Sequence, residues 1–111
     1  MNVLAYINEE EGITRLAGNK DFYYKLLRKV VDSKEISGLK QAIKEKDAVK
    51  AAEFAHAIKG VSGNLSLTLL FQQSGILTEA LRKGIIDREM CRKFFHCYDK
   101  TVSAVKELVS D

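Results

Sequence analysis

The chain has 111 residues, 46% hydrophobic and 30% charged, and its 18 basic and 15 acidic residues leave a net charge of +3. This length and composition predict one folded domain spanning residues 1–111. The small and evenly mixed charge argues against a nucleic-acid partner, because nucleic-acid binders gather lysines and arginines on one face. No stretch approaches the ~20 apolar residues that cross a bilayer, and no basic-then-apolar leader opens the chain, so we expect no membrane contact and a cytoplasmic location.

Helices are the expected elements throughout the chain. Proline, which breaks helices, is absent, and no run alternates apolar and polar residues as a strand would. Capping residues and glycine breaks predict helices over residues 9–17, 19–31, 34–45, 48–64, from the turn at 64–66 to 83, and 88–109. Short loops between such helices predict an all-α fold, an antiparallel four-helix bundle with additional short N-terminal helices, and we expect a monomer.

Apolar side chains at helical spacing identify the expected core. These positions are Phe22, Leu26, Leu27 and Val30, then Ile36, Leu39 and Ile43, and finally Phe94, Tyr98, Val105 and Leu108.

Two cysteines and a histidine on the last predicted helix form no expected site. Cys91 and Cys97 are six residues apart, which places them on different sides of a helix and about 9 Å apart along its axis, so a disulfide between them is implausible. Together with His96 they do not converge on one ion. We therefore expect reduced thiols, a surface histidine and no metal site.

Residues 56–66, HAIKGVSGNLS, form the most informative segment. In a helix over residues 48–64, one apolar stripe is expected at Phe54, Ile58, Val61 and Leu65. At about 100° per residue, His56 falls roughly opposite this stripe, on a face that it shares with Lys59, Gly60 and Gly63. We therefore expect an exposed imidazole beside one ammonium group and two missing side chains.

The two glycines weaken this helix, because each costs roughly 0.5–1 kcal/mol relative to alanine. A partner protein that approaches His56 closely would explain them. A structural explanation is also open: a neighbouring helix packs closely against Gly60 or Gly63, or the helix ends at Gly63 with a glycine cap.

This segment resembles the signature of histidine-containing phosphotransfer (HPt) domains. His56, Lys59 and Gly60 match the family's H-x-(L/I)-K-G pattern, and residues 62–65 match the small residues and the Asn-Leu step that follow it. Residues 7–19, INEEEGITRLAGN, are similar to the family's opening segment, and residues 77–82, LTEALR, are similar to the helix after the histidine hairpin. The ordered set covers residues 7 to 83, which is most of the chain.

Two residues depart from the family pattern. Ser66 stands where the family usually has glycine, at the turn between two helices, and serine is tolerated there if its φ is negative. Thr78 stands where many members have glutamine or glutamate facing the phosphorylated histidine. Its hydroxyl leaves a hydrogen bond possible.

The resemblance implies a phosphocarrier of a two-component phosphorelay rather than an enzyme. His56 would accept a phosphoryl group from an aspartate of one receiver domain and pass it to another, without ATP binding or autophosphorylation. The implied partners are response-regulator receiver domains and a hybrid sensor kinase, and the receiver would bring the Mg²⁺, so the chain needs no cofactor of its own. Lys59 would stabilise charge on the phosphoryl group. Partner contacts are expected at Glu53, Gly60, Gly63, Gln72 and Thr78.

Other functions are left open by the sequence. An HPt-like module could dock receiver domains without relaying phosphate, although the intact His56, Lys59 and Gly60 favour transfer. A chemotaxis-kinase-type domain, or a detached HPt domain of a hybrid kinase, would use the same chemistry. A small basic nucleic-acid binder would need lysines and arginines clustered on one helix face, and the mixed charges do not supply them.

Overall fold

A computed structural model describes residues 2–110 of the chain. A short 3-10 helix, η1 (Val3–Ala5), precedes α1 (Glu9–Arg15), α2 (Lys20–Val30), α3 (Lys34–Lys44), α4 (Ala48–Asn64), α5 (Thr68–Arg82) and α6 (Arg88–Val109). The predicted all-α class is confirmed over the described residues. Each predicted helix is present, and its ends lie within two residues of those expected.

Polar side chains begin most of these helices. Asn8, Asn19, Ser33, Asp47 and Asp87 each stand at an N-cap and accept a hydrogen bond from the backbone N–H three residues later. Such a cap satisfies a donor that the helix itself leaves unpaired and contributes about 1 kcal/mol. The predicted helix starts after Asn8, Asp47 and Asp87 are therefore confirmed.

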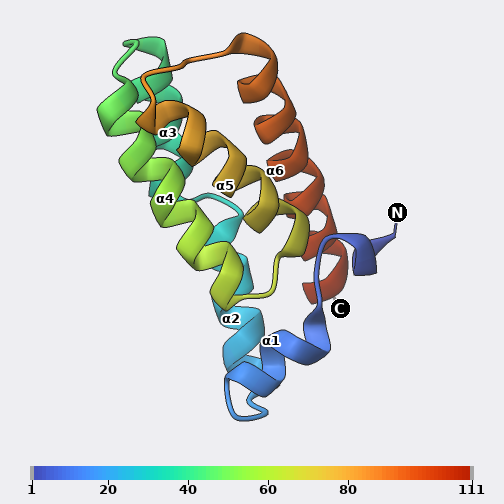
Figure 1. The fold of residues 1–111 in the computed structure, drawn as a ribbon. Coiled ribbons are helices and arrows are strands. Elements are labelled where there is room, and N and C mark those ends of the chain that lie inside the picture. Colours follow the sequence, from blue (N-terminus) through green and yellow to red (C-terminus); the bar gives the residue numbers. More distant parts are fainter. Residues whose placement is uncertain (1, 111) are drawn as a thin grey trace.

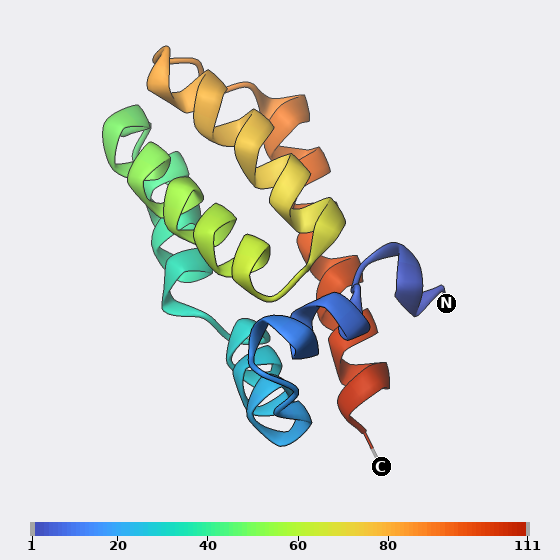
Figure 2. The same ribbon diagram turned by 60° about the horizontal axis from the view of Figure 1, so that its bottom comes forward.

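The helices α4 and α5 lie side by side and antiparallel, joined by a short turn (Figures 1 and 2). α3 packs along α4, and α6 packs along α5 (Figure 1). α2 contacts α6, and α1 lies against α2 at the end of the molecule where α4 turns into α5 (Figure 2). The resulting body is elongated, with principal extents of 40 × 26 × 19 Å.

The core lies between these helices. Its fully buried large side chains include Tyr23, Leu27, Leu39, Leu70, Leu77, Leu81, Phe94 and Val105. One predicted core position, Phe22, is wrong, because its side chain is 44% exposed and the adjacent Tyr23 is buried in its place. The Tyr23 hydroxyl has a buried acceptor in the Leu65 carbonyl, so this ring can be buried without leaving its polar end unpaired.

The buried face of α4 consists of Ile58 and four small residues, Ala51, Ala52, Ala55 and Ser62. The predicted apolar stripe is therefore wrong at Val61, which is 42% exposed and borders a cavity of about 360 Å³. Small side chains let a neighbouring helix approach closely. The orientation of α4 thus follows its small residues rather than its largest apolar ones.

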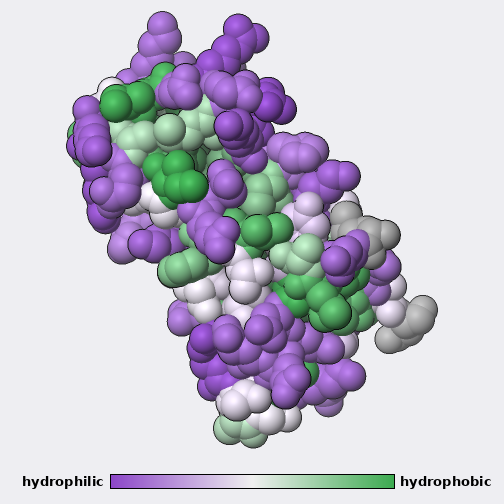
Figure 3. All heavy atoms as spheres, turned by 45° about the vertical axis from the view of Figure 1, so that its right-hand side comes forward, coloured by the Kyte–Doolittle hydropathy of each residue, from purple (hydrophilic) through white to green (hydrophobic). Residues whose placement is uncertain are grey.

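Hydrophilic side chains cover most of the face drawn in Figure 3, and smaller hydrophobic areas lie between them. The large apolar side chains that are exposed in the described part of the chain are Leu4, Phe22, Val49, Val61, Phe71, Ile76 and Ile85. Within residues 2–110, no helix is both long enough and apolar enough to pass through a membrane.

We expect Gly12→Ala to lower the free energy of unfolding by about 1–3 kcal/mol, because its Cβ would overlap the buried ring of Tyr23. Urea unfolding followed by circular dichroism measures this change. Gly60→Ala is the matched control in another helix, since nothing lies within 4 Å of a Cβ there, and it should raise the free energy by about 0.5–1 kcal/mol. Equal shifts in the two variants would contradict the prediction.

Candidate functional site

His56 lies near the middle of α4, and its side chain is exposed, as predicted. Gly60, one turn later, has no atom within 4 Å of the place that a Cβ would occupy. Glu53 is exposed one turn before His56, and Val49 is 75% exposed two turns before it. The imidazole therefore stands on an open helix face with room beside it for a large partner.

Lys59 does not extend freely into solvent, because its side chain lies across α5. Its Cε would be 3.6 Å from a Cβ placed on Gly75, which is an ordinary van der Waals contact, so the lysine stem lies directly beside this turn of α5. Its Nζ lies 5.5 Å from the centroid of the Phe71 ring. A cation over an aromatic face is stabilised by about 0.5–1 kcal/mol at an exposed site. The ammonium is thus held at the edge between α4 and α5, one turn from His56.

The two glycines after His56 have different surroundings. A Cβ on Gly63 would lie 3.0 Å from Cε1 of Phe71, whereas Gly60 faces open space. The close approach of a neighbouring helix, which the sequence left open, therefore explains Gly63. The Phe71 ring occupies the space beside Gly63, and the partner contact expected at Gly63 stays a prediction.

Thr78 lies inside the molecule rather than on the face of His56. The antiparallel register that sets Lys59 across Gly75 also brings Thr78 level with His56, but the Thr78 side chain is only 2% exposed. Its hydroxyl donates to the Ser74 carbonyl at 2.6 Å. The partner contact expected at Thr78 stays a prediction, and in this structure the Thr78 hydroxyl is bonded within α5.

The remaining expected contact residue on α5, Gln72, is exposed next to Phe71. Sequence reasoning missed Phe71 and Gly75, the two α5 residues that hold Lys59. A usable signal was present, because in a helical hairpin whose pairing is centred on residue 67 residue 71 faces residue 63 and residue 75 faces residue 59. That pairing depends on locating the turn to within one residue.

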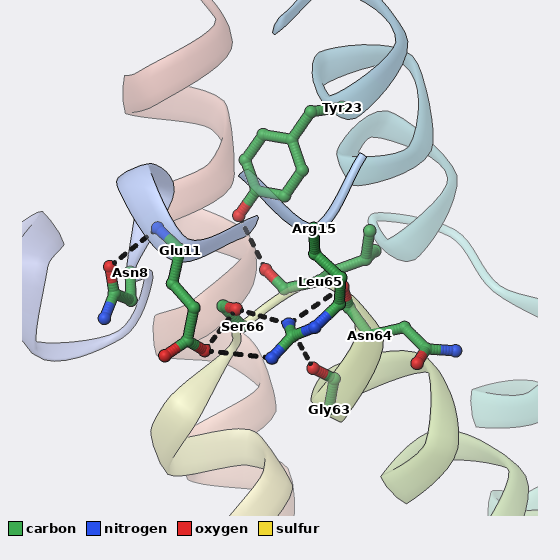
Figure 4. Close-up of polar contacts among 8 residues, drawn as sticks. All are labelled: Asn8, Glu11, Arg15, Tyr23, Gly63, Asn64, Leu65 and Ser66. Carbon is green, nitrogen blue, oxygen red and sulfur yellow. Dashed lines mark hydrogen bonds and ion pairs between the residues drawn. The ribbon is translucent and has the colours of Figure 1, made fainter. Parts of the chain in front are cut away.

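The turn between α4 and α5 has an unexpected backbone conformation at Ser66. Its φ is +56°, so the negative angle under which serine would be tolerated at this turn is not present. Leu67 N donates to Ser62 O at 2.9 Å and Ser66 N to Gly63 O at 3.3 Å, which is a common way to close a helix and normally places glycine in the left-handed position. Figure 4 shows the Ser66 side chain directed toward Arg15 and Glu11 of α1.

The second histidine and the two cysteines lie away from this face, on α6. Cys91 is buried and Cys97 half-buried, both are free, and burial raises the pKa of each thiol. His96 is exposed. Over residues 2–110, no three histidine, cysteine or acidic side chains lie close enough together to hold a metal ion.

No protein-family model, no curated protein and no solved structure matches this chain.

We expect Phe71→Leu to move the Cε proton resonance of Lys59 downfield, because the ring that now shields it is lost. The same change should lower the free energy of unfolding by about 0.5–1 kcal/mol more than a matched control does. Phe22→Leu is that control, because Phe22 and Phe71 are 44% and 40% exposed. NMR assignment of Lys59 and urea unfolding give the two readouts, and an unchanged Lys59 resonance would show that the contact is absent in solution.

Proposed function

We propose that this chain is a histidine phosphotransfer protein of a two-component phosphorelay. In this proposal His56 accepts a phosphoryl group from the aspartate of one receiver domain and passes it to the aspartate of another. The observation that supports it most directly is the exposed imidazole of His56 in the middle of a long helix, with open space at Gly60 and the Lys59 ammonium held one turn away.

The transfer step needs little chemical machinery on this chain. A lone pair on one imidazole nitrogen of His56 forms the new N–P bond while the P–O bond to the receiver's aspartate breaks, and the aspartate leaves as a carboxylate. The other ring nitrogen loses its proton to water, so the phosphohistidine ring is neutral. The second transfer reverses this exchange with another receiver. Positioning and electrostatics supply most of the catalysis in such reactions.

Lys59 would supply positive charge to the phosphoryl oxygens. Its half-buried stem lies against α5 beside Gly75, so part of its side-chain freedom is already lost before the ammonium turns toward His56. The cation–π contact with Phe71 is weak enough for a doubly charged phosphoryl group to compete for the ammonium. Mg²⁺ and the acidic pocket belong to the receiver, so the chain acts as a phosphocarrier and binds no ATP.

The surroundings of His56 suit a protein partner. Glu53 and Gln72 are exposed near the histidine face, and Val49 and Phe71 add exposed apolar surface on α4 and α5. We place the receivers, and the hybrid sensor kinase that carries the first of them, on this face. The proposal includes an antiparallel four-helix bundle formed by α3 to α6, to which the N-terminal helices are added, and a monomer that acts in the cytoplasm.

A second function has one observation in its favour. The burial of Thr78 removes a polar neighbour that would otherwise hydrogen-bond near the phosphorylated ring. A module that docks receiver domains without relaying phosphate would not need that neighbour. The two functions differ in whether label is transferred.

We expect His56→Gln to abolish phosphoryl acceptance and to leave the helical fold intact, because the exposed side chain packs little. The measurement is transfer of labelled phosphoryl groups from a panel of phosphorylated receiver domains in the presence of Mg²⁺. The label should be acid-labile and alkali-stable, as phosphohistidine is. His96→Gln, which changes the other histidine, should retain full acceptance. Label on the His56→Gln variant would move the site elsewhere, and binding without label on the native chain would favour the docking module.

We expect Lys59→Ala to slow transfer to His56 roughly tenfold, a smaller loss than the 10²–10³ of a buried oxyanion donor, because the ammonium is partly solvated. Single-turnover kinetics at saturating receiver separate this loss from weaker binding. Lys100→Ala, which removes an exposed lysine of α6, is the charge control and should not change the rate. An unchanged rate in Lys59→Ala would remove this lysine from the proposed mechanism.

A further inference from the structure

The C-terminal end of α4 is hydrogen-bonded to residues 8–23, near the start of the chain. We call residues 8–23 the opening segment from here on. Arg15 Nη1 donates to Gly63 O at 2.9 Å, to Asn64 O at 3.2 Å and to Ser66 Oγ at 2.7 Å (Figure 4). One guanidinium therefore binds two carbonyls of the last turn of α4 and the side chain of the turn that follows.

The next two carbonyls are bonded by the same segment. The Tyr23 hydroxyl donates to Leu65 O at 2.6 Å inside the protein, and Asn8 N donates to Ser66 O at 2.9 Å. Each of the four carbonyls from residue 63 to residue 66 thus accepts a hydrogen bond from the opening segment. Gly63 O also accepts from Ser66 N, whereas Asn64 O and Leu65 O are carbonyls that a helix end cannot satisfy by itself.

Glu11 completes the arrangement. Its Oε1 accepts from Ser66 Oγ at 2.6 Å and lies 3.3 Å from Arg15 Nη2 (Figure 4). The hydrogen bond from Ser66, and then the nearby Arg15, lower the pKa of the Glu11 carboxyl. The carboxylate therefore stays ionised near neutral pH and holds the Ser66 hydroxyl and the guanidinium together.

This end of α4 needs such support more than an ordinary helix end does. Gly60 and Gly63 weaken its last two turns, because glycine gains the most conformational freedom when a helix opens. Ser66 holds a left-handed backbone angle that a side chain disfavours. The positive charge of Arg15 also lies at the negative end of the helix dipole, where it is stabilising.

We propose that Arg15 is a positioning residue, and that the opening segment acts through it as a clamp that keeps the glycine-containing last turns of α4 helical. Gly60 leaves the histidine face open but weakens the helix. The hydrogen bonds of the clamp stabilise the helix and offset this loss. The consequence for phosphoryl transfer rests on the proposed function above, whereas the clamp itself does not.

Amide hydrogen exchange on the complete chain tests the clamp without any receiver domain. The reporters are the amides of Leu65 and Leu67, which donate to Val61 O and Ser62 O. In Arg15→Gln we expect their exchange to rise at least tenfold relative to amides in the middle of α6. A uniform increase over all helices, or none at Leu65 and Leu67, would overturn the proposal.

Three further variants separate a clamp from a general loss of stability. Arg28→Gln is the matched control, because Arg28 also donates to a carbonyl at a helix end, Val109 O at 3.4 Å, and it should leave the α4 reporters unchanged. Adding Ser66→Gly to Arg15→Gln should recover part of the protection, since glycine accepts the left-handed angle. If Arg15→Gln does not fold, Tyr23→Phe is the second variant, because it removes only one hydroxyl. It should speed exchange of the Leu67 amide, alone or together with the Leu65 amide. Unchanged exchange at both amides would also overturn the proposal.

A transfer assay then links the clamp to the proposed reaction. In Arg15→Gln, the single-turnover rate at saturating receiver should fall several-fold, and Ser66→Gly should recover it in parallel with the exchange protection. If local exchange rises in Arg15→Gln but no receiver labels the native chain, the proposed function is refuted and the clamp is supported. A normal rate in a variant whose α4 end has opened would overturn the positioning role of Arg15.

Discussion

The structure around His56 depends on the turn that follows α4. Ser66 takes a left-handed backbone angle there, and this angle sets the residue at which the chain reverses direction. The reversal fixes the antiparallel register in which Gly63 meets Phe71 and Lys59 lies across Gly75. A turn displaced by one residue would rotate every side chain of α5 by about 100° relative to α4, and Lys59 would lose its support.

A second constraint is the small size of the buried side chains of α4. Ala51, Ala52, Ala55 and Ser62 form most of its buried face, and side chains of this size let neighbouring helices approach closely. His56 then remains on the outer side, where a partner can reach it. On α5, Thr78 is buried and its hydroxyl is bonded to its own helix.

An open histidine face and a stable helix place opposite demands on α4. Glycine near the histidine favours access and weakens the helix, and the structure meets both demands by placing the support elsewhere in the chain. Arg15 and Tyr23 donate hydrogen bonds to carbonyls at the end of α4, although each lies more than forty residues earlier in the sequence than the carbonyl that it binds. In the proposed phosphorelay, residues on the histidine face could differ to suit different receivers, because the hydrogen bonds that stabilise the end of α4 lie outside that face.

The sequence by itself determined the helices and the exposure of His56. N-caps such as Asp47 act on an amide three residues away, and a helical wheel needs only the spacing of neighbouring residues, so both can be predicted locally. The tertiary structure alone decided that Tyr23 rather than Phe22 is buried, at which residue the α4–α5 pairing is centred, and that Arg15 reaches the end of α4. These features depend on how closely and in which register whole helices pack, and packing between distant segments leaves no periodic signal in a single sequence.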